Sequence, residues 1–148
     1  LEFICGKENI DLKEMLRILN KESGLLGLSK GLSSDFRDLN EAREQGNPDA
    51  KRAVDCLCYR IVKYIGSYAA AMNGVDAIAF TAGVGENDKT GRKNICSSLA
   101  FMGVEIDDEA NNVRGEERVI SSPNSKVKVM LIPTNEELAI ARETLALV

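Results

Sequence analysis

Apolar residues recur at helical spacing through the first half of the chain. Residues 1–20 are predicted to form two helices, because a glycine and an asparagine interrupt the pattern and Asp11 can cap the second helix, whose apolar face we expect to pack. Asn47-Pro48-Asp49 is typical of a helix start. The long helix predicted after it carries one apolar stripe at Val54, Leu57, Ile61, Ile65, Tyr68 and Met72. Gly74 is predicted to end this helix.

Short apolar runs separated by turns characterise the second half and indicate strands. Residues 77–81 predict a buried strand, a Gly-x-Gly turn follows, and a helix is expected over residues 88–101. Further elements are expected as strands at 104–106, 119–120 and 126–132, a helical turn at 107–112, and a last helix at 136–148 with Leu138, Ala141 and Leu145 inward. Strands that alternate with helices predict an α/β fold.

Composition and charge exclude several classes of protein. The 148 residues are 44% hydrophobic and 28% charged, which is typical of one globular domain. The 19 basic and 23 acidic residues alternate, so no basic stripe is available to bind nucleic acid. No apolar run approaches the roughly 20 residues of a membrane span, and the first residues do not resemble a signal peptide. We therefore expect a cytoplasmic protein that binds neither nucleic acid nor membrane.

The cysteine and histidine content limits the available chemistry. The 4 cysteines form no C-x-x-C pair, and Cys56 and Cys58 point to different faces of a predicted helix, so free thiols are expected rather than a zinc site. The chain contains no histidine, which excludes a His-based triad or general base within it. Chemistry must come from carboxylates, arginines, a bound metal or another piece of protein.

The Gly83-Val84-Gly85 turn after the strand invites a nucleotide interpretation, because glycines let a ligand approach the backbone and helix N–H groups suit an anion. A Rossmann fingerprint is the rival, and an acidic pair follows about 20 residues later. Against it, Asp88 occupies the third glycine position. A turn that merely closes a tight strand–helix connection is the other alternative.

A second strand end runs into a helix at Pro133-Thr134-Asn135. Ligands gather at the carboxyl ends of strands in open α/β sheets, so both strand ends are expected to face one cleft. Glu136 and Glu137 follow at a helix start, where a carboxylate can hold Mg²⁺ together with substrate phosphates. Ordinary first-turn acids favoured by the helix dipole are an equally good explanation of these two residues.

Residues 23–38 contain 3 glycines and 4 serines and show no sustained period. Ser33, Ser34 and Asp35 can cap a helix that begins near Arg37. The functional alternative is a binding loop, in which Asp35 offers an acceptor, Arg37 a fork of donors and Phe36 an apolar face for a purine. Both interpretations stay open at this point.

Several strings together resemble the acetate kinase family, which includes the propionate kinases, with butyrate kinase more distant. They are residues 19–27, 33–38, 64–72, 80–87 and 133–138, and the resemblance covers nearly the whole chain. It implies an actin-like ATPase, ribonuclease H-like, domain of the acetate and sugar kinase/Hsp70/actin superfamily, with a mixed sheet flanked by helices. Residues 1–148 are then expected to form a single C-terminal nucleotide-binding domain, without the N-terminal half.

The family resemblance also implies a set of site residues. Gly83, Val84, Gly85, Glu86 and Asn87 would bind the adenosine of ATP or ADP, and Asp35, Phe36 and Arg37 would line the same pocket. Glu136 would help place Mg²⁺ (or Mn²⁺), and Arg92 would be a possible nucleotide contact.

The same resemblance implies that the groups that bind acetate and stabilise the transferred phosphoryl group lie in the N-terminal half. No catalytic residue is therefore expected here, and the isolated chain is predicted to be inactive, although the full enzyme would transfer the γ-phosphoryl group of ATP to acetate. The full protein is expected to be a homodimer. Propionate kinase is one alternative, and a stand-alone nucleotide-binding or interaction module is another.

Overall fold

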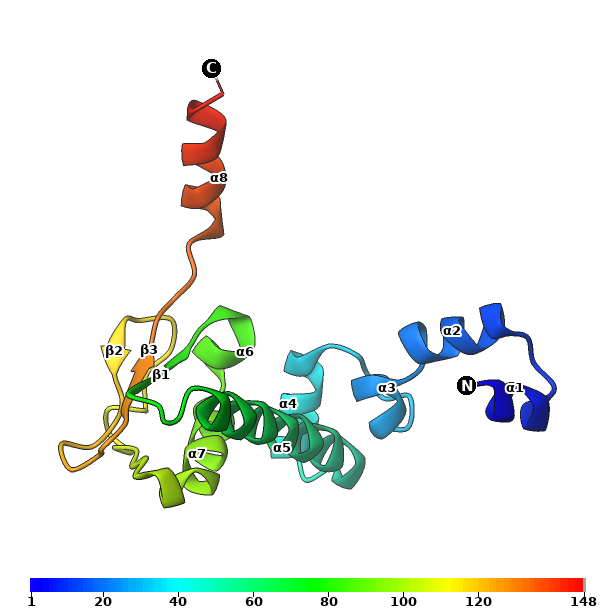
Figure 1. The fold of residues 1–148 in the computed structure, drawn as a ribbon, viewed down its shortest axis with the longest axis horizontal. Coiled ribbons are helices and arrows are strands. Elements are labelled where there is room, and N and C mark those ends of the chain that lie inside the picture. The colour runs from blue at the N-terminus through cyan, green and yellow to red at the C-terminus, as the bar shows by residue number, and fades with distance from the viewer. Residues whose placement is uncertain (148) are drawn as a thin grey trace. The chain divides into compact units, whose positions relative to one another are not determined.

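The computed structural model describes residues 1–147. The chain divides into two compact units, the first over residues 1–60 and the second beginning at residue 61. The first unit is helical and contains α1 (Glu2–Glu8), α2 (Leu12–Lys21), α3 (Gly24–Leu28) and α4 (Phe36–Glu44). Helix α5 (Pro48–Ala71) runs from the first unit into the second (Figure 1). The expected pair of N-terminal helices is confirmed, and Asp11 caps α2 by accepting a hydrogen bond from the Glu14 N–H.

Three strands form the sheet of the second unit. They are β1 (Ala77–Phe80), β2 (Arg118–Val119) and β3 (Lys128–Leu131), in the order β1-β3-β2. β1 pairs with β3 in parallel, with Phe80 opposite Leu131, whereas β2 pairs with β3 antiparallel. The remaining elements are α6 (Ala82–Asn87), α7 (Lys89–Ser98), a 3-10 turn (Ala100–Met102) and α8 (Glu136–Leu145). The sheet is mixed, as the resemblance implied.

Two predicted elements differ from the structure in this region. The strand expected at 104–106 is reduced to one antiparallel bridge between Ile106 and Ser121. The buried strand expected at 77–81 is buried on one face only, because Ile78 and Phe80 point inward while Ala77 and Ala79 are exposed. Nothing among residues 1–147 covers the second face. The apolar run predicted the strand correctly but did not indicate whether one or both faces of the strand are buried.

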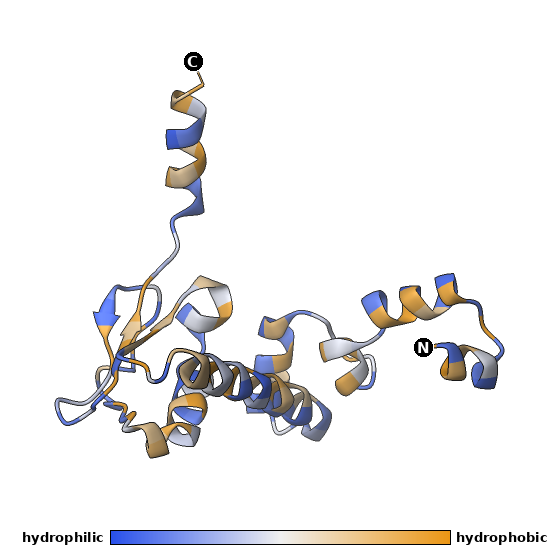
Figure 2. Cartoon of the chain, viewed as in Figure 1, coloured by the Kyte–Doolittle hydropathy of each residue, from blue (hydrophilic) through white to orange (hydrophobic). Residues whose placement is uncertain are grey.

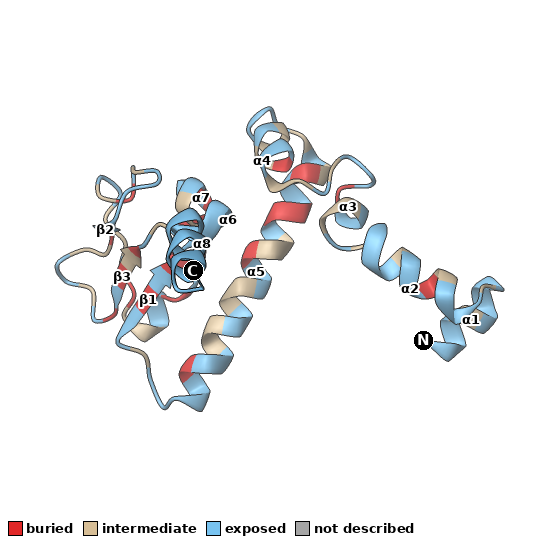
Figure 3. Ribbon diagram, turned by 90° about the horizontal axis from the view of Figure 1, so that it is seen from above, coloured by how far each residue is buried: buried red, intermediate tan, exposed pale blue. Residues whose placement is uncertain are grey.

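Buried residues are unevenly distributed among the elements (Figure 3). The core of the second unit combines Ile78, Val129 and Leu131 of the sheet with Ile95 and Leu99 on or beside α7. In contrast, every residue of α8 is exposed, although the helix carries several hydrophobic residues (Figures 2 and 3). The expectation that Leu138, Ala141 and Leu145 face inward is therefore wrong in this chain.

The long apolar stripe of α5 and the apolar face of α2 are also only partly buried. Val54 is fully buried, whereas Tyr68 and Met72 are exposed, and Met15 is the one buried position of α2. Helical spacing correctly located both apolar faces. How much of each face is buried depends on whether other described residues pack against it. The expected last helix ends at Leu145, and Val148 of that prediction lies outside the described residues.

Candidate functional site

The carboxyl ends of β1 and β3 lie at the same edge of the sheet. Because these strands are parallel neighbours, their exits are adjacent, and the Ile132 N–H extends the ladder by donating to the Phe80 carbonyl at 2.9 Å. The Gly83–Asn87 segment follows the first exit and the Thr134–Glu136 segment follows the second. The two strand ends are thus adjacent, as expected, and the cleft that they were expected to face stays a prediction.

The Gly83–Asn87 segment is helical rather than a glycine turn. Helix α6 begins at Ala82, directly after Thr81, and the backbone reverses at Ala82, whose φ of 57° lies in the left-handed region. The predicted glycine turn is therefore wrong, whereas the helix predicted from residue 88 is present as α7, which begins at Lys89. The physical reason is that the sharp change of direction occurs at one non-glycine residue, which leaves both glycines free to adopt ordinary helical backbone angles.

The two glycines of this segment have different surroundings. A Cβ atom on Gly85 would lie 3.3 Å from the carbonyl carbon of Phe80, so the close approach of α6 to β1 explains this glycine. A Cβ atom on Gly83 would meet nothing within 4 Å. No contact among the described residues explains why position 83 is a glycine. The open side of Gly83 leaves room for a ligand to approach the backbone.

Polar contacts hold both ends of α6. The Asn87 amide donates to the Gly83 carbonyl at 2.7 Å, and its oxygen accepts from Arg114 Nε at 2.6 Å. Glu86 Oε1 accepts from the N–H of Thr134 at 2.9 Å and from its hydroxyl at 3.1 Å. Neither Thr134 nor Arg114 was selected from the sequence as a site residue. Only the structure reveals them, because 48 and 27 residues separate the partners.

Arg92 of α7 is buried beneath this segment, with 1% of its surface exposed. Its five N–H groups are donated to protein acceptors: Asn111 Oδ1 and the carbonyl oxygens of Gly85, Glu86, Asn111 and Val113, at 2.8–3.0 Å. Burial lowers the pKa of Arg92, and the nearby Asp88 opposes that shift, but a guanidinium stays charged in proteins. With every donor engaged, Arg92 positions α6 and has no donor left for a nucleotide.

Glu136 is the first residue of α8 and is exposed. Asn135 caps this helix by accepting from the Leu138 N–H at 3.0 Å. Within residues 1–147 no group of three or more Asp, Glu, Cys or His side chains could hold a metal ion. The exposed carboxylate of Glu136 is of the ligand type that Mg²⁺ uses, since Mg²⁺ normally binds one or two carboxylates together with phosphate oxygens and water.

Asp35, Phe36 and Arg37 belong to the first unit, at the start of α4. Asp35 caps this helix, since its Oδ1 accepts from the Arg37 N–H at 2.8 Å and its Oδ2 pairs with Arg37 Nη2 at 2.8 Å. The hydrogen bonds from Arg37 lower the pKa of Asp35 to about 2. Phe36 is half-buried and Arg37 is exposed. The capping interpretation is confirmed, and the binding-loop interpretation stays a prediction.

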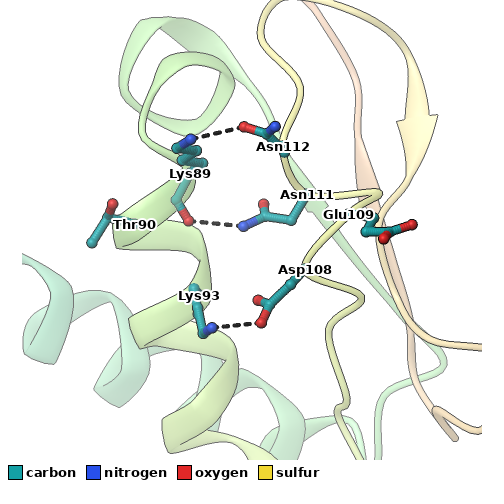
Figure 4. Close-up of a pocket in the computed structure, with 7 residues that line it drawn as sticks. All are labelled: Lys89, Thr90, Lys93, Asp108, Glu109, Asn111 and Asn112. Atoms are coloured by element: carbon teal, nitrogen blue, oxygen red, sulfur yellow. Dashed lines mark hydrogen bonds and ion pairs between the residues drawn. The ribbon is translucent and has the colours of Figure 1, made fainter.

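A cavity of about 370 Å³ lies elsewhere in the second unit, between α7 and residues 108–112 (Figure 4). It is lined by Lys89, Thr90, Lys93, Asp108, Glu109, Asn111 and Asn112. Its two lysines already donate, one to Asn112 and the other to Asp108, at 2.7 Å each. None of the predicted site residues lines this cavity.

Two further features of the structure bear on the sequence predictions. All four cysteines are free, as expected, and Cys96 and Cys58 are buried. No helix among residues 1–147 has both the length and the apolar character that crossing a membrane requires.

Comparisons with known proteins agree on one family. The model of the acetokinase family matches residues 1–142. An acetate kinase of Lachnoclostridium phytofermentans is 57% identical over the whole chain, which spans 37% of that relative's length. One from Fervidobacterium nodosum is 59% identical over 96% of the chain and 35% of its own length.

Solved structures give the same result. The crystal structure of Porphyromonas gingivalis acetate kinase matches 98% of this chain with a TM-score of 0.88 and 45% identity, over 36% of its own length. A propionate kinase from Francisella tularensis matches 96% of this chain with a TM-score of 0.84 and 39% identity. The predicted α/β, actin-like fold is confirmed.

Proposed function

The chain belongs to the acetokinase family, and on this premise we propose that it is the C-terminal nucleotide-binding domain of an acetate kinase. Such an enzyme transfers the γ-phosphoryl group of ATP to acetate, giving acetyl phosphate and ADP, and the reaction is reversible. The single observation that carries the proposal beyond family membership is the edge where β1 and β3 end. There, the open side of Gly83 and the carboxylate-bearing start of α8 follow adjacent parallel strands.

In this proposal the described residues bind and orient the nucleotide. Gly83, Val84, Gly85, Glu86 and Asn87 form the adenosine side of the site, with Gly83 giving the closest backbone approach. Asp35, Phe36 and Arg37 of the first unit are proposed as further nucleotide-binding residues, and the half-buried ring of Phe36 suits an apolar contact with a purine. Asp35 orients Arg37 through their 2.8 Å ion pair.

Glu136 is the residue that would hold Mg²⁺ (or Mn²⁺), which would neutralise charge on the phosphate oxygens. Phosphoryl transfer depends on positioning both substrates and on neutralising the charge of the transferred phosphoryl group. An active enzyme therefore also needs groups that bind acetate. We assign them to residues outside this sequence, since the chain has no histidine and spans about a third of its relatives' length. The isolated chain is therefore expected to be inactive.

The wider assignment follows from the same proposal. We place the complete enzyme in the cytoplasm, as a homodimer, with ATP or ADP and acetate as its small-molecule partners and no role for nucleic acid or membrane. Propionate kinase is the second candidate, because the TM-score of 0.84 for the Francisella tularensis propionate kinase is close to the 0.88 for the Porphyromonas gingivalis acetate kinase. A stand-alone nucleotide-binding or interaction module is the alternative outside the enzyme classes.

A hybrid enzyme tests the proposal. Residues 1–148 would replace the matching segment of the Lachnoclostridium phytofermentans acetate kinase, to which they are 57% identical. We expect the hybrid to form acetyl phosphate from ATP and acetate, while the 148-residue chain alone forms none. A folded hybrid that neither binds ADP nor turns over acetate or propionate would contradict the proposal. Turnover by the chain alone would contradict the assignment of the acetate site to other residues.

A further inference from the structure

We propose that Glu86 is a positioning residue, which fixes the start of α8 and thereby the place of the Glu136 carboxylate. The resemblance implied a direct nucleotide contact for Glu86. The inference rests on the proposed function, because it gives Glu86 a role toward the metal carboxylate of that same site.

The contact that carries the inference joins the two strand exits. Glu86 Oε1 receives two hydrogen bonds from Thr134, one from the N–H at 2.9 Å and one from the hydroxyl at 3.1 Å. Bonds to an ionised acceptor are stronger than those between neutral groups. Because β1 and β3 are parallel neighbours, α6 after β1 lies beside the chain that leaves β3. Glu86 thus ties two segments that are 48 residues apart.

Few other interactions define where α8 begins. Every residue of α8 is exposed, so packing of the helix itself does not set its place. Asn135 caps the helix, but that bond is local to α8. Thr134 precedes Glu136 by two residues, which puts their Cα atoms at most roughly 7 Å apart. Anchoring Thr134 therefore restricts the region that the Glu136 carboxylate can occupy.

Glu86 itself is held firmly enough to act as an anchor. Arg92 donates to the Gly85 and Glu86 carbonyls at 2.8 and 3.0 Å, and this arginine is buried. The backbone of Glu86 is thus held in place by the core of the second unit. The Glu86 side chain in turn holds Thr134 in place through its hydrogen bonds. Removing a group that hydrogen-bonds a metal ligand directly commonly changes metal affinity about 10- to 100-fold. Glu86 acts one step further away, through Thr134, so we expect an effect at the lower end of that range.

The test uses the 148-residue chain and titrates it with ADP by calorimetry at a series of Mg²⁺ concentrations. For Glu86→Ala we expect the Mg²⁺ concentration for half-maximal enhancement of ADP binding to rise roughly tenfold. Glu86→Gln keeps an acceptor oxygen for both Thr134 donors, so it should lie within about threefold of the wild type, as a neutral acceptor makes a weaker bond. Glu143→Ala, an exposed glutamate later in α8, is the matched control and should change nothing.

The pattern among the variants decides the role. If Glu86→Gln is as defective as Glu86→Ala, the charge itself contacts nucleotide or metal, and the positioning role is overturned. If Glu86→Ala leaves the Mg²⁺ dependence unchanged, the inference is also overturned. Thermal unfolding of each variant separates these outcomes from a general loss of stability, which would weaken ADP binding equally at all Mg²⁺ concentrations.

A structural measurement distinguishes a failure of the positioning role of Glu86 from a failure of the proposed nucleotide site. Hydrogen exchange of the Thr134 amide should accelerate in Glu86→Ala and stay slow in Glu86→Gln, whether or not ADP binds. If the wild-type chain binds no ADP at any Mg²⁺ concentration, the proposed nucleotide site fails for this chain. In that case unchanged Thr134 exchange in Glu86→Ala overturns the positioning role, and accelerated exchange supports it.

Discussion

The Gly83–Asn87 segment and the Asp35–Arg37 segment are both predicted to bind nucleotide, but they are held in place by different kinds of contact. Glu86, Asn87 and the carbonyls of α6 bond to Thr134, Arg114 and Arg92, at separations of 6 to 48 residues. Asp35 bonds to Arg37, two residues away. The first segment therefore depends on the fold of the second unit, whereas the second segment can form with its own helix. Substitutions should affect the two very differently.

The largest expected effect is that of Arg92→Met. This change removes the donor to the carbonyl oxygens of Gly85, Glu86, Asn111 and Val113, of which the Asn111 bond is buried and the others are part-buried. Losing a buried charged network should lower the free energy of unfolding by about 3 kcal/mol or more. Denaturant unfolding measures this, with Arg114→Met as the control. Arg114 is exposed, and its side chain makes one hydrogen bond within residues 1–147, so its loss should cost less than about 0.5 kcal/mol. Equal losses would contradict the long-range account of this segment.

Gly85→Val should have the next largest effect on stability. Its Cβ atom would lie 3.3 Å from the Phe80 carbonyl carbon, and its branches would push α6 away from β1. Crowding of this kind costs about 1–3 kcal/mol. Thermal unfolding of the variant beside the wild type measures the loss. A variant as stable as the wild type would show that α6 can move away from β1 without cost.

Asp35→Ala should be milder and confined to α4. The substitution removes the acceptor for the Arg37 N–H and the partner of its guanidinium, so the first turn of α4 should fray. NMR amide shifts should change around residues 35–39 and not in the second unit. Glu44→Ala, which removes an exposed acid of the last turn of α4, is the control. Spectral changes that extend over residues 82–87 would contradict the local account.

The smallest effect is the acid titration of the same cap. Because the pKa of Asp35 is lowered to about 2 from 3.8, its contribution is complete above about pH 4 and is lost as the pH falls toward 2. Amide shifts of the first turn of α4 should follow this titration in the wild type and not in Asp35→Ala. A midpoint near 3.8 would show that the Arg37 interactions are absent in solution.

The same contrast explains how much could be predicted from the sequence. Local signals were sufficient for the caps of α2 and α4, for the start of α5 at Pro48 and for the strands β1 and β3. The strand-exit edge followed from a general rule for α/β sheets, and the family resemblance is confirmed by the match over residues 1–142.

What the sequence could not provide depends on distant partners. No pattern near Glu86 indicates Thr134, and nothing near Arg92 indicates that residues 111 and 113 will occupy all its remaining donors. The left-handed backbone at Ala82 was also missed, because glycine is the usual residue for that region. The inward face predicted for α8 failed for a related reason, since apolar spacing identifies a face and not its partner.

One titration tests the central claim, that the Gly83–Asn87 segment forms a nucleotide site. Gly83→Ala adds a methyl group that meets no protein atom within 4 Å and should stabilise α6 by up to about 1 kcal/mol. We predict that the variant unfolds at the same or a higher temperature than the wild type but binds ADP with Mg²⁺ at least about tenfold more weakly in calorimetry, a loss of roughly 1.4 kcal/mol. Equal ADP affinity in the stable variant would contradict the claim, because the ligand would then not approach the open side of Gly83.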